Sequence, residues 1–234
     1  YIAKREDDYI PYGPVTSPLK MLSVGRHIRE RYNLDKPRFK FHFIEHHLCH
    51  QASSFLISPF EEAACLSIDG CGEWTTTMTA YGKNDSFEVL NRIYAPHTLG
   101  TFYNSVCEFL GFKFLEGPGK VMGMAPYGDP DRYYDEFKKT VILKDDGTFE
   151  LNFSYFDFHV TRTKKRYSKK FERIFGLKRE IGGEITQHHM DIAAAAQRVL
   201  EETCFHILYH LSRKTASKNL CLSGGVALNS VMNQ

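Results

Sequence analysis

The chain of 234 residues has a single tryptophan, only six cysteines and no long uninterrupted apolar run. A membrane-spanning helix needs roughly 18–20 consecutive apolar residues, so none is expected, and no secretory signal is visible. The cysteines are too sparse and too irregularly spaced for a disulfide framework. Three of them, Cys65, Cys204 and Cys221, fall in apolar stretches, where buried reduced thiols are usual. We therefore expect a cytoplasmic protein with no membrane partner.

The chain also lacks an excess of charge of either sign. It has 30 basic and 28 acidic residues, a net charge of +2, which gives no general attraction to nucleic acid or to an anionic membrane. One segment, residues 162–179, is locally basic, but no pattern of interleaved aromatic side chains accompanies it. We interpret it as a solvated face rather than an anion or nucleic-acid patch, and expect no nucleic-acid partner.

The pattern of apolar residues predicts a mixed α/β protein. The three strands expected at 63–68, 74–82 and 87–94 are joined by short turns, which is typical of an antiparallel meander. Further strands are expected at 219–223, 39–44 and 149–158. Helices are predicted at 16–31, from 46 to near 59, at 99–110 and at 186–214, with another beginning within 228–233.

Two histidines at helical spacing suggest a metal site. His46 and His50 are four residues apart, so a helix would stack both imidazoles on one face. Asp69 follows an apolar strand and precedes a glycine, a common place for a carboxylate that contacts a metal or phosphate. Two imidazoles and a carboxylate suit iron, manganese or zinc. The alternative is an ordinary pair of surface histidines.

Two glycine-rich segments are candidate anion sites. Gly224 and Gly225 follow a strand and precede an expected helix, where exposed amides favour phosphate oxygens, and Asn229 could add hydrogen bonds. The segment 117–128 is interpreted as a loop in which Lys120 could clamp a phosphate. The alternatives are a plain tight turn for the first segment and a surface lysine for the second.

Six ordered segments together resemble the O-carbamoyltransferases of nodulation-factor and antibiotic biosynthesis, and the likeness covers most of the chain from about residue 41. The segments are His-His-Leu-Cys-His-Gln-Ala-Ser-Ser-Phe at 46–55, Ser-Ile-Asp-Gly-Cys-Gly-Glu-Trp at 67–74, Leu-Gly-Thr-Phe-Tyr at 99–103, Gly-Lys-Val-Met-Gly-Met-Ala-Pro-Tyr-Gly at 119–128, Asp-Ile-Ala-Ala-Ala-Ala-Gln at 191–197 and Asn-Leu-Cys-Leu-Ser-Gly-Gly-Val-Ala-Leu-Asn at 219–229.

The resemblance implies a ribonuclease-H-like fold of the actin, sugar-kinase and chaperone ATPase superfamily, related to the tRNA threonylcarbamoyltransferase. It implies ATP-dependent transfer of a carbamoyl group from carbamoyl adenylate to a hydroxyl of a small-molecule acceptor. Carried over by motif, His46, His50 and Asp69 become ligands of a divalent metal, with iron favoured over manganese or zinc. Lys120, Gly224, Gly225 and Asn229 become contacts to the nucleotide. No residue is assigned as the catalytic base.

The resemblance also predicts how the chain is divided. Residues 1–40 are expected to be an arm and helix left from a preceding subdomain, and 41–234 the core of the transfer domain. The final acidic ligand and the domain that makes carbamoyl adenylate from carbamoyl phosphate would follow Gln234, so we expect a fragment that does not complete transfer alone. Pro118 replaces an acidic residue usual in the family's first glycine loop.

Three other functions remain as alternatives: a tRNA threonylcarbamoyltransferase-like enzyme, a non-catalytic nucleotide-binding or assembly module and a metal hydrolase. The last would need a general base beside the histidines. Glu45 is the neighbour in sequence, but it is expected to face away from them on the helix.

Overall fold

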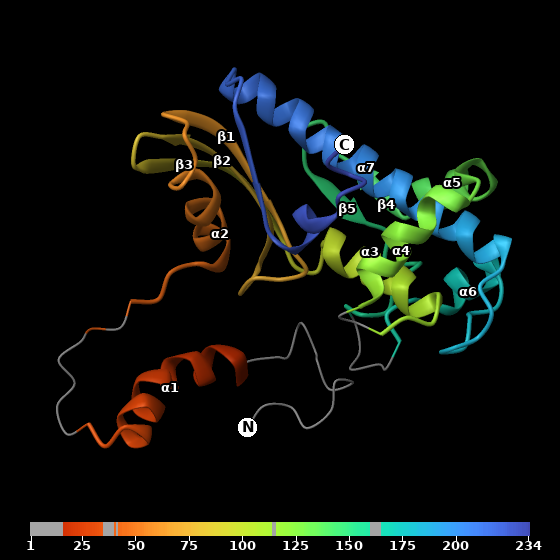
Figure 1. Ribbon diagram of the computed structural model, residues 1–234, viewed down its shortest axis with the longest axis horizontal. Helices are drawn as coiled ribbons and strands as arrows, with labels where there is room; N and C mark the ends of the chain where they lie inside the picture. The colour runs from red at the N-terminus through yellow and green to blue at the C-terminus, as the bar shows by residue number, and fades with distance from the viewer. Residues whose placement is uncertain (1–15, 35–39, 41, 114–115, 160–164) are drawn as a thin grey trace.

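The structure is a computed structural model that describes residues 16–34, 40, 42–113, 116–159 and 165–234 (Figure 1). Its centre is a four-stranded sheet in the order β3-β2-β1-β6. Strands β1 (Glu62–Ile68), β2 (Thr75–Lys83) and β3 (Ser86–Tyr94) form an antiparallel meander. Strand β6 (Leu220–Ser223) pairs with β1 in parallel, from Ala64 opposite Leu220 to Ser67 opposite Ser223. The predicted meander and mixed α/β class are therefore confirmed.

Helices cover both faces of this sheet. Because side chains alternate along β1, Cys65 packs with Phe55 of helix α2 (His46–Phe55) on one face. Leu66 and Ile68 point to the other face and join the large core beneath α3 (Leu99–Phe109) and α7 (Gln187–Thr215). Figure 1 shows α2 and α7 on opposite sides of the strands. The predicted helices at 16–31, 46–59, 99–110 and 186–214 all exist, the first as α1 (Thr16–Arg31).

A second group of short elements packs against α7. It comprises the hairpin β4 (Val141–Leu143) and β5 (Phe149–Leu151) and the helices α4 (Gly117–Met124), η2 (Ala125–Tyr127), η3 (Pro130–Arg132), α5 (Tyr134–Lys138) and α6 (Lys169–Phe175). Aromatic rings in edge-to-face and tilted contact fill its interior, among them Phe137, Phe171 and Phe175, which are fully buried. These rings account for much of the chain's high phenylalanine content.

The predicted loop at 117–128 is wrong, since the segment opens with helix α4. Pro118 lies in the first turn, where a missing N–H leaves no hydrogen bond unmade. Gly117 is required by packing rather than by a loop, because a Cβ there would lie 2.7 Å from the Cβ of Cys107 on α3. Close approach of two helices, invisible in the local pattern, explains this glycine.

Three smaller predictions also fail. The described residues of the expected strand at 39–44 (40 and 42–44) form no strand; they are exposed, and no described strand pairs with them. The strand at 149–158 ends at Leu151. In place of the expected helix within 228–233 the chain forms the 3-10 turn η4 (Gly225–Leu228) and further turns. The side chain of Asn229 is hydrogen-bonded to Gln197 on α7.

All six cysteines are free, and Cys65, Cys204 and Cys221 are buried as predicted. Among the described parts of the chain, no helix combines the length and the apolar character that crossing a bilayer requires. The division at residue 40 stays a prediction, since residues 1–15 and 35–39 lie outside the described ranges.

Candidate metal centre

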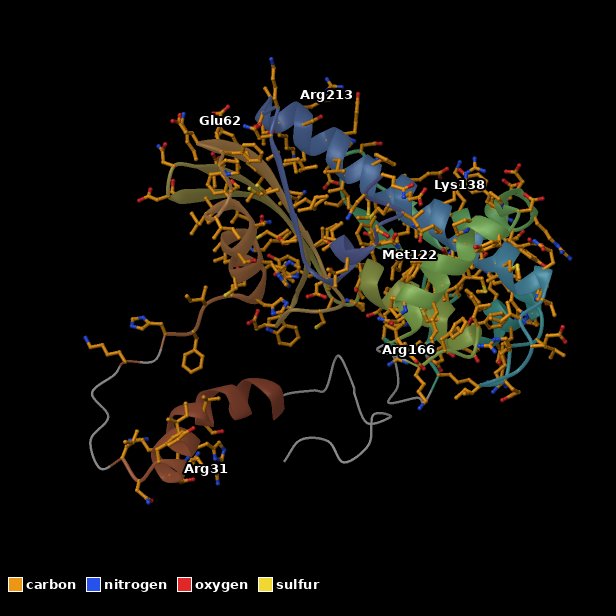
Figure 2. All side chains as sticks on the ribbon, viewed as in Figure 1. Arg31, Glu62, Met122, Lys138, Arg166 and Arg213 are labelled. Carbon is orange, nitrogen blue, oxygen red and sulfur yellow. The ribbon has the colours of Figure 1, made fainter. Side chains whose placement is uncertain are left out.

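The two histidines and the aspartate meet where β1 ends beside the first turn of α2. Figure 2 marks Glu62, where β1 begins, and Arg213, near the end of α7, at one end of the sheet. Asp69 follows the opposite end of β1. The Nε2 atoms of His46 and His50 lie 3.0 and 2.9 Å from the same oxygen, Oδ2 of Asp69. The predicted trio is therefore brought together.

The geometry of this trio matches what a single ion requires. The three candidate donor atoms all lie within 4.8 Å of one another, and the three residues are neither fully buried nor fully exposed. The imidazole rings of His46 and His50 have centroids 4.5 Å apart and are nearly perpendicular, so both Nε2 atoms converge without the rings stacking. Two nitrogens and one carboxylate oxygen fit iron, manganese or zinc, with further positions left for substrate or solvent.

Hydrogen bonds keep the aspartate ionised. Burial acts to raise the pKa of Asp69, but hydrogen bonds from His46, His50 and the Gly70 amide outweigh it and lower the pKa below its usual value. The Gly70 amide donates to Oδ1 at 2.6 Å, leaving Oδ2 to face the two imidazoles. A carboxylate anchored on one oxygen presents the other in a defined direction.

The adjacent, buried side of α2 holds the helix on the sheet. His47 is fully buried, and its Nδ1 lies 2.8 Å from Oγ of Ser67. The same hydroxyl accepts a hydrogen bond from Nε2 of Gln51, which also donates to the carbonyl of Met78. Burial, together with the nearby His46 and His50, lowers the pKa of His47 to about 4, so this imidazole is neutral at pH 7. The buried polar side of α2 therefore sets which way His46 and His50 point.

The second glycine segment lies directly against the site. A Cβ on Gly225 would stand 2.9 Å from Oδ1 of Asp69, and a Cβ on Gly224 would stand 2.3 Å from the carbonyl oxygen of Ile68. Gly224 also has a φ of +90°, which a residue with a side chain adopts only under strain. Parallel pairing of β6 with β1 places these glycines beside the carboxylate.

The other two predicted contacts lie elsewhere. Asn229 is buried, and its amide exchanges hydrogen bonds with the amide of Gln197 on α7 at 2.9 and 3.0 Å. Lys120 is half exposed on α4, donates to Glu116 at 2.7 Å and lies over the ring of Phe112. None of these partners belongs to the histidine–aspartate cluster.

Sequence reasoning missed the contacts of two carboxylates at the start of α2. Glu45, expected on the helix, instead precedes it, and its carboxylate accepts hydrogen bonds from Arg92 and Thr75. Glu73 accepts a hydrogen bond from the backbone N–H of His46 at 3.1 Å. Only the folded hairpin reveals either contact, because both partners are distant in sequence.

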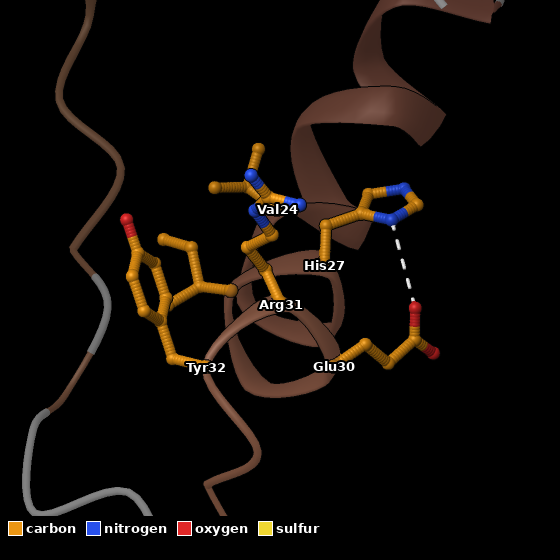
Figure 3. Close-up of a pocket in the computed structure, with 6 residues that line it drawn as sticks. Val24, His27, Glu30, Arg31 and Tyr32 are labelled. Carbon is orange, nitrogen blue, oxygen red and sulfur yellow. Dashed lines mark ion pairs between the residues drawn. The ribbon is translucent and has the colours of Figure 1, made fainter.

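A hollow at the end of α1 does not belong to this site. Its lining comes from α1 and the residue after it, where His27 lies 3.8 Å from Glu30 on an exposed surface (Figure 3). It contains none of the predicted site residues: its lining residues are Val24, His27, Ile28, Glu30, Arg31 and Tyr32.

The fold and the site thus define a mixed α/β protein with a candidate centre of two histidines and one carboxylate. The family described as carbamoyltransferase N-terminus matches residues 22–234. The chain belongs to this family.

Individual relatives agree with this assignment. The chain is 42% identical over 193 residues to an uncharacterised protein of Synechocystis, covering 82% of this chain and 31% of that protein. It is 35% identical to nodulation protein NolNO of Sinorhizobium fredii, covering 82% of this chain and 26% of the relative, and 34% identical to nodulation protein NolO of Bradyrhizobium diazoefficiens, covering 81% and 32%. The chain therefore covers between 26% and 32% of the length of these three relatives.

Proposed function

We propose that this chain is the transfer part of an ATP-dependent O-carbamoyltransferase. In that reaction a hydroxyl of a small-molecule acceptor attacks the carbamoyl carbon of carbamoyl adenylate, and AMP leaves. Family membership supports carbamoyl transfer. A further domain of a longer protein would supply carbamoyl adenylate from carbamoyl phosphate, in keeping with the greater length of the relatives. A ribonuclease-H-like fold, a cytoplasmic location and the absence of a nucleic-acid partner remain part of the proposal.

The observation that carries the proposal is the convergence of His46 and His50 on one oxygen of Asp69. The donor set fits a divalent metal, for which we favour iron over manganese or zinc. When bound, the ion would act as a Lewis acid toward the phosphate or carbamoyl oxygens of the adenylate. His46 and His50 would hold it through Nε2, and Asp69 would do so through Oδ2.

The turn at Gly224 and Gly225, beside the Asp69 carboxylate, is the proposed nucleotide-binding site. Gly225 is exposed beside Asp69, and the backbone of such a glycine turn can contact a phosphate directly. Asn229, tied to Gln197, would set the position of this turn in addition to any contact with the nucleotide. Lys120 remains a proposed phosphate contact. To bind a phosphate, its ammonium group would have to leave its ion pair with Glu116.

One titration series tests the metal centre. We expect calorimetry with manganese(II), zinc(II) and anaerobic iron(II) to show one ion per chain, and loss or strong weakening of binding in His46→Ala, His50→Ala and Asp69→Asn. His42→Ala removes an exposed histidine just before α2 and is the matched control. Binding that survives all three site substitutions, or its absence in the unsubstituted chain, would contradict the metal centre.

A second titration separates an enzyme core from an inert module. ATP is added with and without the bound ion, and we expect affinity that depends on the metal. Gly225→Ala should weaken ATP binding, and Lys120→Ala tests the lysine separately. Failure of ATP to bind under either condition would contradict the nucleotide site and favour a non-catalytic assembly module. A metal hydrolase is disfavoured because Glu45 is already engaged by Arg92 and Thr75.

A further inference from the structure

Helix α2 carries both histidines of the proposed centre but lacks a cap of its own. Glu45 occupies the N-cap position, yet its side chain makes no capping hydrogen bond, and the first turn contains no acidic residue. Its carboxylate is instead held by Nη2 of Arg92 at 2.9 Å and by Thr75 at 2.8 Å. The first backbone N–H groups of a helix have no partner within the helix, so another group must satisfy them.

A carboxylate from a distant turn supplies this contact. Oε2 of Glu73 accepts the N–H of His46 at 3.1 Å, across 27 residues of sequence. A negative charge at this end of a helix is favourable because the N–H dipoles point toward it. The bond involves an ionised acceptor, which makes it stronger than one between neutral groups.

The same short turn contacts His46 at three points. Asp69, at its start, lies 3.0 Å from the imidazole Nε2, and Glu73, at its end, binds the backbone N–H. Between them, a Cβ added to Gly72 would lie 3.1 Å from the Cβ of His46, so the backbone of Gly72 lies close to this side chain. A hydrogen bond from the Gly72 amide to the carbonyl of Thr75, at 2.8 Å, closes the turn. This turn therefore approaches the imidazole, the Cβ and the backbone N–H of His46.

We propose that Glu73 is a positioning residue of the metal centre, which holds His46 in place by capping α2 from the β1–β2 turn. The inference rests on the proposed function, because it concerns the ion that His46 and His50 would bind. Metal ligands must be held within a few tenths of an ångström of their binding geometry, and His46 is the first residue of its helix. Without the cap the first turn of α2 loses helical structure, and His46 then no longer keeps a fixed position.

The test compares three variants by two measurements. Glu73→Ala removes the acceptor, Glu73→Gln keeps an oxygen acceptor without the charge, and Glu88→Ala removes an exposed carboxylate on β3 as the control. We expect Glu73→Ala to weaken manganese(II) binding about tenfold, as loss of a supporting contact to a metal ligand does. Glu73→Gln should restore most of that loss, and Glu88→Ala should bind as the unsubstituted chain does.

Hydrogen exchange on the metal-free protein gives the second readout. Glu73→Ala should speed exchange of the amides in the first turn of α2 while leaving α7 unchanged. Equal manganese affinity in Glu73→Ala and Glu88→Ala, or failure of Glu73→Gln to restore binding, would overturn the inference. If the unsubstituted chain binds no manganese, the proposed function loses its metal centre. The capping role of Glu73 is then tested by hydrogen exchange alone. Unchanged exchange of the first-turn amides of α2 in Glu73→Ala would overturn that role.

Discussion

A Cβ on Gly225 would lie 2.9 Å from Oδ1 of Asp69, so a glycine in the turn after β6 leaves room for the carboxylate that follows β1. The atom that a Cβ at position 225 would meet, Oδ1 of Asp69, is the end of a side chain rather than part of the backbone. A small side chain at position 225 should therefore move the carboxylate while the fold remains intact.

We expect Gly225→Ala to weaken metal binding at least about tenfold, because the displaced carboxylate no longer faces the two imidazoles. Its free energy of unfolding should stay within about 1 kcal/mol of the original value. Calorimetry with manganese(II) and urea unfolding measure the two effects. Gly123→Ala is the control, since its Cβ would meet nothing within 4 Å. Equal metal affinity in the two variants would contradict the prediction.

The neighbouring glycine should behave differently. Gly224→Ala forces a side chain into a φ of +90° and against the carbonyl oxygen of Ile68, 2.3 Å away, where only backbone can yield. We expect a loss of about 3 kcal/mol in unfolding free energy, from strain and overpacking together. Urea unfolding of Gly224→Ala beside Gly225→Ala measures the contrast. Comparable stability in the two would show that the turn relaxes easily.

The hydroxyl of Ser67 anchors α2 through two side chains. Ser67→Ala removes the partner of His47 Nδ1 and one partner of Gln51, leaving a buried polar ring nitrogen unsatisfied. We expect a loss of about 1–3 kcal/mol in unfolding free energy. Ser53→Ala, which removes an exposed hydroxyl from the same helix, should change stability by no more than about 0.5 kcal/mol. A Ser67→Ala variant as stable as Ser53→Ala would contradict the anchoring role.

Asp191 gives a prediction for pH. Burial acts to raise the pKa of Asp191, but hydrogen bonds from the Asp129 amide, Gln187 and Arg132 lower it overall. A carboxyl whose pKa is lower in the folded state stabilises the protein above its unfolded pKa of about 4, and the benefit is lost as the pH falls through the folded value. Asp191→Asn should thus cost about 2 kcal/mol at pH 7 and progressively less below about pH 4.

Urea unfolding of both proteins from pH 7 to pH 3 measures this difference. Asp145→Asn, on an exposed turn, is the control and should show almost no cost at any pH. A cost for Asp191→Asn that does not change with pH would contradict the assignment of the lowered pKa.

Local patterns predicted most of the regular elements. The apolar period of α7 and the β-branched run of β2 each favour one conformation from neighbouring residues alone. The local pattern failed at residues 117–124, where glycines suggested a loop. Gly117 allows α4 to pack closely on α3, and close packing is a property of two helices rather than of one segment.

The sequence by itself determined the residue types of the candidate centre and the class of the fold, because helical spacing and strand ends depend on neighbours along the chain. Only the tertiary structure decided that Gly225 borders Asp69, that Asn229 binds Gln197, that Lys120 pairs with Glu116 and that Glu73 caps α2. The contacts of Gly225, Asn229 and Glu73 join segments far apart in sequence, and that of Lys120 depends on a helix that local pattern did not predict. Such contacts arise when the sheet forms and the helices pack upon it.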